Sequence, residues 1–266
     1  MRNRVAVFTS IDATLLDAKT FEPGINKKTI AQFESEGIAV VPVTLMTLDE
    51  IAPIASALGL RHAMVTEAGG AIARWAGDGW EIEACGAPAE ALLDAIRHIE
   101  ERSGANLLVY SALPHDQASR LSGRRGEMLE ASRHRRFSEP FIIESGDLEA
   151  VRRAAEEIGL SVRRGRRFFH LCRTGNDGGA FERLRKELRC DITIGVGGSM
   201  VDAEFLRRAD VPIIVPMPDE PLDPELIAAV PAARIATEPA PNGWSVAVLE
   251  ALTKMRTVAT GNVSRQ

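Results

Sequence analysis

Short apolar runs alternate with amphipathic segments through the first part of the chain, and this alternation restricts the fold more than any other feature. The apolar runs are residues 5–9, 38–43 and 62–66, and segments with helical spacing separate them at 26–36 and 47–58. Strand, helix and strand in this order are typical of parallel sheets whose crossovers are helices. The sequence therefore predicts an α/β fold built on a parallel sheet.

The second amphipathic segment carries signals for both of its ends. Thr47 and Glu50 have the spacing of a capping box, and Gly59 stands where glycine commonly terminates a helix. Farther along the chain, two short runs flank the sequence Gly77-Asp78-Gly79, which is the pattern of a β-hairpin. We expect this hairpin to mark the exit from the first domain.

The pattern then changes for about eighty residues before the parallel rhythm returns. The intervening segments have mixed α/β character, and the later apolar runs at 192–196 and 212–215 again alternate with helical segments. We therefore predict one domain formed by residues 1–84 and 168–266, interrupted by an inserted domain formed by residues 85–167.

The end of the sequence predicts one more helix. It begins near Asn242 and places Trp244, Val248 and Leu252 on one face. Residues 257–266 lose all periodicity, and we expect them to form a disordered tail.

Charge and hydropathy exclude several classes of function. The 266 residues include 32 Lys and Arg against 37 Asp and Glu, a formal charge of −5, so no overall positive field attracts nucleic acid or an anionic membrane. No apolar run approaches the length of a membrane span. The three cysteines lack the spacing of a metal site. We expect a soluble cytoplasmic protein without nucleic-acid or membrane partners.

In a doubly wound sheet, ligands bind beyond the carboxyl ends of the strands. Ser10 and Asp12 follow the first predicted strand, and Thr44 follows the second. Two glycine-containing segments, 67–70 and 195–202, follow later strands. These positions are the ones at which we expect chemistry.

The same positions carry a resemblance to a known family. Residues 10–14, Ser-Ile-Asp-Ala-Thr, resemble the first motif of haloacid dehalogenase superfamily phosphatases, whose usual form is Asp-x-Asp-Gly-Thr. Further segments are similar to motifs of the mannosyl-3-phosphoglycerate phosphatase family; they are Glu-Ala-Gly-Gly at 67–70, RRFSEPF at 135–141, RFFHL at 167–171 and Asn-Gly-Trp at 242–244. The resemblance implies a Rossmann-like core with an inserted type IIB α/β cap.

The family reaction needs groups that this chain lacks. The resemblance implies an aspartate nucleophile where this chain has Ser10, and an acid-base aspartate, which Asp12 provides. It implies a lysine where Gly178 stands, and Mg²⁺ held by a final acidic motif of which only Asp202 remains. We therefore expect a weak metal site at Asp202 or none, and no cofactor; Mg²⁺ is implied by the resemblance alone.

Several other residues are candidates for binding a substrate or another anion. Arg135, Arg167 and His170 match positions of the family motifs, and the others lie in loops that follow strands. The full set is Arg135, Arg167, His170, Thr44, Gly69, Gly70, Gly197 and Gly198. Simpler roles are open for each kind of residue. The arginines can form a solvated surface, and the glycines can serve merely to let the loops turn. Asp12 and Asp202 can accept hydrogen bonds from backbone amides.

Three functions follow from these observations. The leading hypothesis is a phosphatase relative without catalysis, a pseudoenzyme that binds a small anionic sugar or glycerate ligand or a protein partner. The second is an active Mg²⁺-dependent phosphatase acting on a phosphorylated sugar-glycerate. The third is another reaction in the same cleft, which the fold does not exclude.

Overall fold

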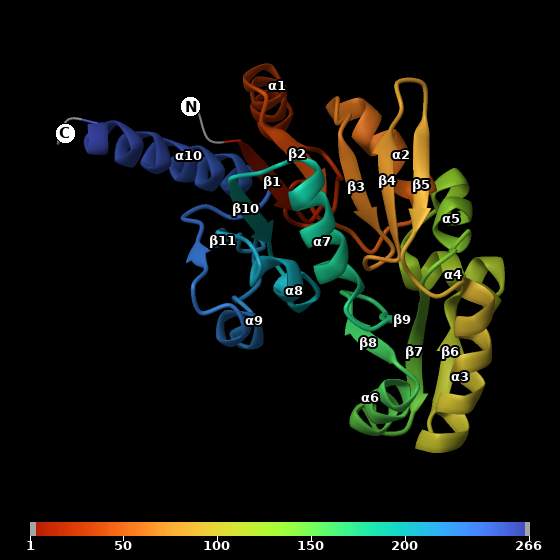
Figure 1. Cartoon of the computed structure of the whole chain (residues 1–266). Coiled ribbons are helices and arrows are strands. Elements are labelled where there is room, and N and C mark those ends of the chain that lie inside the picture. The colour runs from red at the N-terminus through yellow and green to blue at the C-terminus, as the bar shows by residue number, and fades with distance from the viewer. Residues whose placement is uncertain (1–3, 264–266) are drawn as a thin grey trace. The chain divides into compact units, whose positions relative to one another are not determined.

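The computed structural model describes residues 4–263, which divide into two compact units (Figure 1). The first unit combines residues 1–41 with residues 185–266, and the second contains residues 42–184. The first unit is thus built from two separate stretches of sequence. Both ends of the predicted inserted domain, at residues 85 and 167, fall inside the second unit.

A five-stranded sheet forms the centre of the first unit. Its order is β12-β11-β10-β1-β2, and β10 is parallel to both β1 and β11. The strands are β1 (Val5–Thr9), β2 (Ala39–Pro42), β10 (Ile192–Gly197), β11 (Val211–Ile214) and β12 (Arg234–Ile235). Neighbouring strands β1 and β10 lie far apart in the sequence, which confirms the predicted parallel sheet interrupted by a long insertion.

Helices and a 3₁₀ turn complete the first unit; they are α1 (Asn26–Glu36), η2 (Met200–Asp202), α8 (Ala203–Leu206), α9 (Pro224–Ala229) and α10 (Asn242–Val263). The predicted face of α10 is confirmed, because Trp244, Val248 and Leu252 are buried. The indole N–H of Trp244 donates a hydrogen bond of 2.8 Å to Thr9 Oγ1, so α10 is attached to the end of β1.

The end of α10 differs from the prediction of a tail. Residues 257–263 belong to the helix, because the helical backbone continues to Val263. The rest of the predicted tail, residues 264–266, lies outside the described residues.

The second unit begins with a three-stranded antiparallel sheet and a helix. Its strands are β3 (Ala63–Thr66), β4 (Ala71–Trp75) and β5 (Trp80–Ala84), and the helix is α2 (Leu48–Leu58). The hairpin β4–β5 and the capping box of α2 are confirmed. The third predicted strand corresponds to β3, which belongs to this separate antiparallel sheet. An isolated parallel bridge joins Val65 of β3 to Val43.

A four-stranded antiparallel sheet forms the rest of the second unit. Its order is β6-β7-β9-β8, and its strands are β6 (Asn106–Val109), β7 (Glu139–Ser145), β8 (Leu160–Arg164) and β9 (Phe169–Arg173). The helical elements are α3 (Ala89–Ser103), η1 (Tyr110–Ala112), α4 (His115–Ser122), α5 (Gly126–Arg133), α6 (Leu148–Glu157) and α7 (Asn176–Glu187). Because β9 pairs with both β7 and β8, this sheet extends past residue 167.

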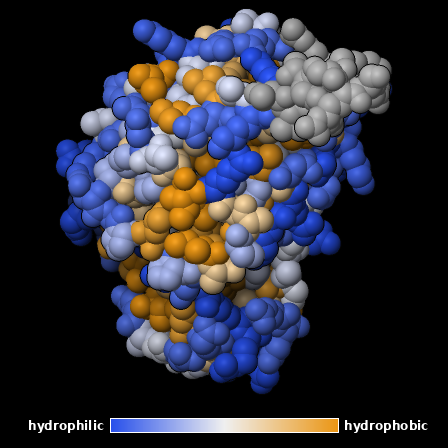
Figure 2. Space-filling model, turned by 90° about the vertical axis from the view of Figure 1, so that its left-hand side faces the viewer, coloured by the Kyte–Doolittle hydropathy of each residue, from blue (hydrophilic) through white to orange (hydrophobic). Residues whose placement is uncertain are grey.

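Each unit has an apolar interior. In the second unit, Leu92 and Ile96 of α3 pack with Phe141, Val151 and Leu171 in one buried cluster. On the face drawn in Figure 2, hydrophilic residues surround a central group of hydrophobic ones. Among the residues that the structure describes, no helix has the length and apolar character needed to cross a membrane.

Candidate functional site

Ser10, which follows β1, is held inside the first unit. It is 7% exposed, and its backbone N–H donates to Val196 O at 2.9 Å. Its hydroxyl donates to Thr14 Oγ1 at 2.8 Å and also lies in hydrogen-bonding reach of the Asp202 carboxyl. A buried hydroxyl in such a network is poorly placed to attack a ligand, because attack requires a free lone pair and an acceptor for its proton.

Asp12, two residues farther along, lies on an exposed turn. The backbone N–H groups of Leu15 and Leu16 donate to Ile11 O at 3.1 and 3.0 Å, which closes the turn around Asp12. Ala13 adopts a φ of 54°, a conformation that favours glycine. The structure thus brings Ser10, Thr14 and Asp202 together and leaves the Asp12 residue exposed.

The loop after β10 closes on the Asp202 carboxylate. Oδ2 of Asp202 accepts hydrogen bonds from the N–H groups of Gly198 at 2.8 Å and Ser199 at 3.0 Å, and from Ser199 Oγ at 3.2 Å. Burial raises the pKa of the Asp202 carboxyl above its ordinary value, although these donors act in the opposite direction. The predicted anion-binding amide of Gly198 is therefore already used by an internal carboxylate.

Close packing explains the two glycines of this loop. A Cβ on Gly197 would lie 2.6 Å from the Asp202 Cβ, and a Cβ on Gly198 would lie 3.0 Å from Val215 O and 3.2 Å from Thr14 Oγ1. Gly197 is thus required for the approach of Asp202. A side chain at residue 198 needs a small shift of its neighbours.

The donor set at Asp202 does not fit Mg²⁺. This ion takes oxygen ligands in octahedral geometry, whereas the Asp202 carboxylate faces N–H and O–H donors and Gly198 supplies no carboxylate. Within residues 4–263, no group of three or more His, Cys, Asp and Glu side chains is arranged to hold a metal ion.

Thr44, Gly69 and Gly70 lie in the second unit and support its loops. Thr44 Oγ1 accepts from Met46 N at 3.1 Å, and its backbone N–H donates to Val65 O at 3.0 Å. Gly69 has a φ of 79°. A Cβ on Gly70 would lie only 2.3 Å from the Cβ of Phe137, so the two loops touch at this point.

The Arg135 guanidinium is engaged on all sides by groups of the second unit. The side chain is 4% exposed and forms ion pairs with Glu50 at 3.7 Å and Glu67 at 3.8 Å. It also donates to Leu45 O and, at 3.1 and 3.0 Å, to Ser138 Oγ. An external anion would have to displace these internal acceptors.

Internal pairing extends to other arginines of the second unit. Arg124 Nε lies 2.6 Å from Glu50 Oε1, and Arg163 forms an ion pair with the buried Asp177. For such arginines the sequence predicts a solvated surface or a binding site for an anion. It does not show the buried ion pairs, because the partner carboxylates lie 74 residues from Arg124 and 14 residues from Arg163. No local pattern identifies them.

Arg167 and His170 have different surroundings. Arg167 Nη1 donates to Ser122 O at 2.6 Å and lies over Gly123, where a Cβ would approach it to 2.3 Å. His170 in β9 is 7% exposed, and its Nδ1 has no hydrogen-bond partner among the described atoms. Of the three residues that match family positions, His170 therefore has one buried nitrogen without a hydrogen-bond partner among the described atoms.

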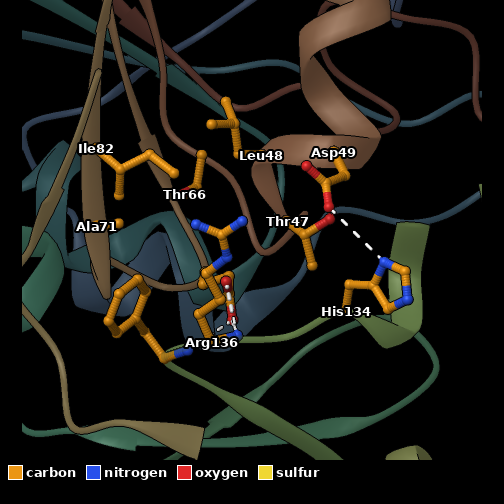
Figure 3. Close-up of a pocket in the computed structure, with 10 residues that line it drawn as sticks. Thr47, Leu48, Asp49, Thr66, Ala71, Ile82, His134 and Arg136 are labelled. Carbon is orange, nitrogen blue, oxygen red and sulfur yellow. Dashed lines mark hydrogen bonds and ion pairs between the residues drawn. The ribbon is translucent and has the colours of Figure 1, made fainter. Parts of the chain in front are cut away.

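A separate pocket lies beside the amino end of α2 (Figure 3). In this view the Arg136 guanidinium points between Thr66, Leu48 and Thr47, and Asp49 lies 3.9 Å from the His134 ring. Glu67, from the predicted segment 67–70, lines this pocket, whereas the residues singled out for catalysis or anion binding do not. Its walls are Thr47, Leu48, Asp49, Thr66, Glu67, Ala71, Ile82, His134, Arg136 and Phe137.

Comparison with known proteins agrees with this architecture. The profile of the haloacid dehalogenase-like hydrolases matches residues 7–148, more than half of the chain. The chain belongs to this family. A subclass IIB sugar phosphatase of the haloacid dehalogenase superfamily has a similar structure, with a TM-score of 0.67 at 14% identity over 92% of this chain and 98% of the other.

Two curated relatives of this haloacid dehalogenase-like hydrolase are similar over nearly their whole length. Both are named glucosyl-3-phosphoglycerate/mannosyl-3-phosphoglycerate phosphatase. The protein from Persephonella marina is 25% identical, over 94% of this chain and 98% of the relative. The protein from Methanococcoides burtonii is 24% identical, over 93% and 97%.

The buried imidazole of His170 predicts a loss of stability in acid. Burial, followed by the positive charges of Arg135, Arg124 and Arg163, lowers the pKa of His170 well below its ordinary value of 6.5. Below pH 6.5 the unfolded chain binds a proton at this residue that the folded chain does not bind. Stability should therefore fall by up to about 1.4 kcal/mol per pH unit until the folded pKa is reached.

Denaturant unfolding at pH 7, 6 and 5 measures this slope. His170→Gln should reduce it, whereas the exposed control His98→Gln should keep the wild-type slope. Equal slopes for wild type and His170→Gln would contradict the buried, neutral state of His170.

Proposed function

We propose that this protein is a mannosyl-3-phosphoglycerate phosphatase-like binding module that does not transfer phosphate. The observation that carries the proposal is Ser10, which stands at the nucleophile position of the family motif and directs its hydroxyl into the buried contact with Thr14. Phosphoryl transfer in the family begins with a carboxylate at this position. The Ser10 hydroxyl is not ionised at neutral pH and is a weak nucleophile.

Two further features support the absence of catalysis. The loop after β10 has Gly198 where the family motif has an acid, and its remaining acid, Asp202, accepts hydrogen bonds from that loop. The start of α7 has Gly178 where the family has a lysine. Nucleophile, metal ligand and cation act as a unit in such a mechanism, so their joint replacement removes more than any one substitution.

The ligand we propose is a small anionic sugar or glycerate derivative. The names of both curated relatives refer to phosphorylated sugar-glycerates, and these relatives match nearly the whole chain. His170 has a buried Nδ1 without a hydrogen-bond partner among the described atoms, and the charges of Arg124, Arg135 and Arg163 act on its imidazole. An anion that reaches this nitrogen would stabilise a protonated imidazole, since it adds a negative charge to a cationic environment.

An active Mg²⁺-dependent phosphatase is the second candidate, because the relatives that match the chain over nearly its full length are named as phosphatases. Asp12 keeps the acid-base position of the motif. This candidate requires another carboxylate to take the role that Ser10 does not fill.

Phosphate release separates the two candidates. We expect no Mg²⁺-dependent hydrolysis of mannosyl-3-phosphoglycerate or p-nitrophenyl phosphate, because Ser10 replaces the carboxylate nucleophile and the hydrogen-bond donors around Asp202 do not suit Mg²⁺. The assay compares the protein with and without EDTA, and Asp12→Asn controls for contaminating phosphatases. EDTA-sensitive turnover that Asp12→Asn abolishes would overturn the proposal in favour of the second candidate.

Rebuilding the motif tests the proposed cause of inactivity. Ser10→Asp alone should give no activity and should lower stability by roughly 3 kcal/mol, because it buries a second carboxylate beside Asp202 without a cation. The triple variant Ser10→Asp, Gly178→Lys, Gly198→Asp should show measurable Mg²⁺-dependent phosphate release. Its activity should stay low, because a side chain at 198 crowds Val215 O. If the single variant were as active as the triple, the assigned roles of positions 178 and 198 would be wrong.

A further inference from the structure

The Glu67 carboxylate lies in a site formed by three consecutive backbone amides. Its Oε2 accepts from the N–H groups of Arg136 at 3.1 Å, Phe137 at 3.0 Å and Ser138 at 3.1 Å. Ser138 Oγ donates to the same oxygen at 3.0 Å, and Glu67 is 3% exposed. Successive N–H groups that converge on one point form an anion-binding concavity. Here the anion is part of the chain.

The backbone around Glu67 adopts an uncommon conformation that brings the two loops together. Glu67, Ala68 and Gly69 have φ values of 50°, 56° and 79°, so two residues with side chains lie in the left-handed region. Such conformations persist when other contacts compensate their strain. The contacts here are the hydrogen bonds to Glu67 and the approach of Phe137 to Gly70.

Further contacts connect the amide site to the amino end of α2. Arg135, directly before the three amides, lies 3.8 Å from Glu67 and also pairs with Glu50 and Leu45 O. Thr47, the N-cap of α2, donates through Oγ1 to Ala131 O at 2.9 Å. The segment 131–138 is thereby attached both to α2 and to the loop after β3.

We infer that Glu67 is a built-in anionic ligand which positions Arg135 and the segment 135–138, and that the site it fills is a carboxylate site. The amides of residues 136–138 and the Ser138 hydroxyl supply four donors, and Arg135 supplies the balancing charge. Without the side chain, these donors lose their common acceptor and that of Ser138 is left buried, so a small free carboxylate gains hydrogen bonds by entering. This inference does not depend on whether the protein transfers phosphate.

Amide hydrogen exchange of the full chain tests the inference. In Glu67→Ala the amides of residues 136–138 should exchange about tenfold faster or more than in wild type, because their common acceptor is lost. Sodium formate at roughly 0.1 M should slow this exchange again in the variant, and sodium chloride at the same ionic strength should not. The matched control Glu81→Ala, which removes an exposed carboxylate, should leave residues 136–138 as protected as in wild type.

Several results would overturn the inference. These are unchanged exchange of residues 136–138 in a folded Glu67→Ala variant, or faster exchange that formate and chloride affect equally. Should Glu67→Ala fail to fold, the same exchange measurement is made on Glu67→Gln. The Gln side chain keeps one acceptor oxygen but adds an NH₂ group that cannot accept from the backbone amides. Protection of residues 136–138 equal to wild type in Glu67→Gln would then count against the role of Glu67.

Discussion

A buried carboxylate must have hydrogen-bond donors, and the loops of both units are arranged around this requirement. In the first unit the loop after β10 directs the amides of Gly198 and Ser199 to Asp202. In the second unit the segment 136–138 directs three amides to Glu67. Leaving either charge without donors would cost several kcal/mol, so these contacts constrain the loops strongly. The amides of Gly198 and Ser199 and those of residues 136–138 are therefore occupied by carboxylates of the chain itself.

The same constraint accounts for the arginines. Arg124, Arg135 and Arg163 each pair with a carboxylate of the second unit, so their charges contribute to its internal stability. His170 differs from these arginines. Its Nδ1 has no hydrogen-bond partner among the described atoms, and the positive charges of the three arginines help to lower its pKa.

Local signals in the sequence predicted the elements, but not these pairings. The capping box of α2, the apolar face of α10 and the hairpin β4–β5 follow from residues that lie close together in the sequence, and the structure confirms all three. The engagement of Arg135 with Glu67 depends on contacts across 68 residues, which no local pattern contains. The raised pKa of Asp202 depends on burial, which spacing does not reveal. The family motif identified both segments without showing that they bind one another.

The central claim is that this haloacid dehalogenase-like hydrolase binds its anionic ligand without transferring phosphate, and phosphorus NMR tests it most directly. Mannosyl-3-phosphoglycerate is titrated with the protein, first in EDTA and then with Mg²⁺. The account predicts that the ligand signal broadens or shifts equally in both conditions, and that no inorganic phosphate signal grows. A phosphate signal that grows only with Mg²⁺, or a ligand signal that never changes, would contradict it.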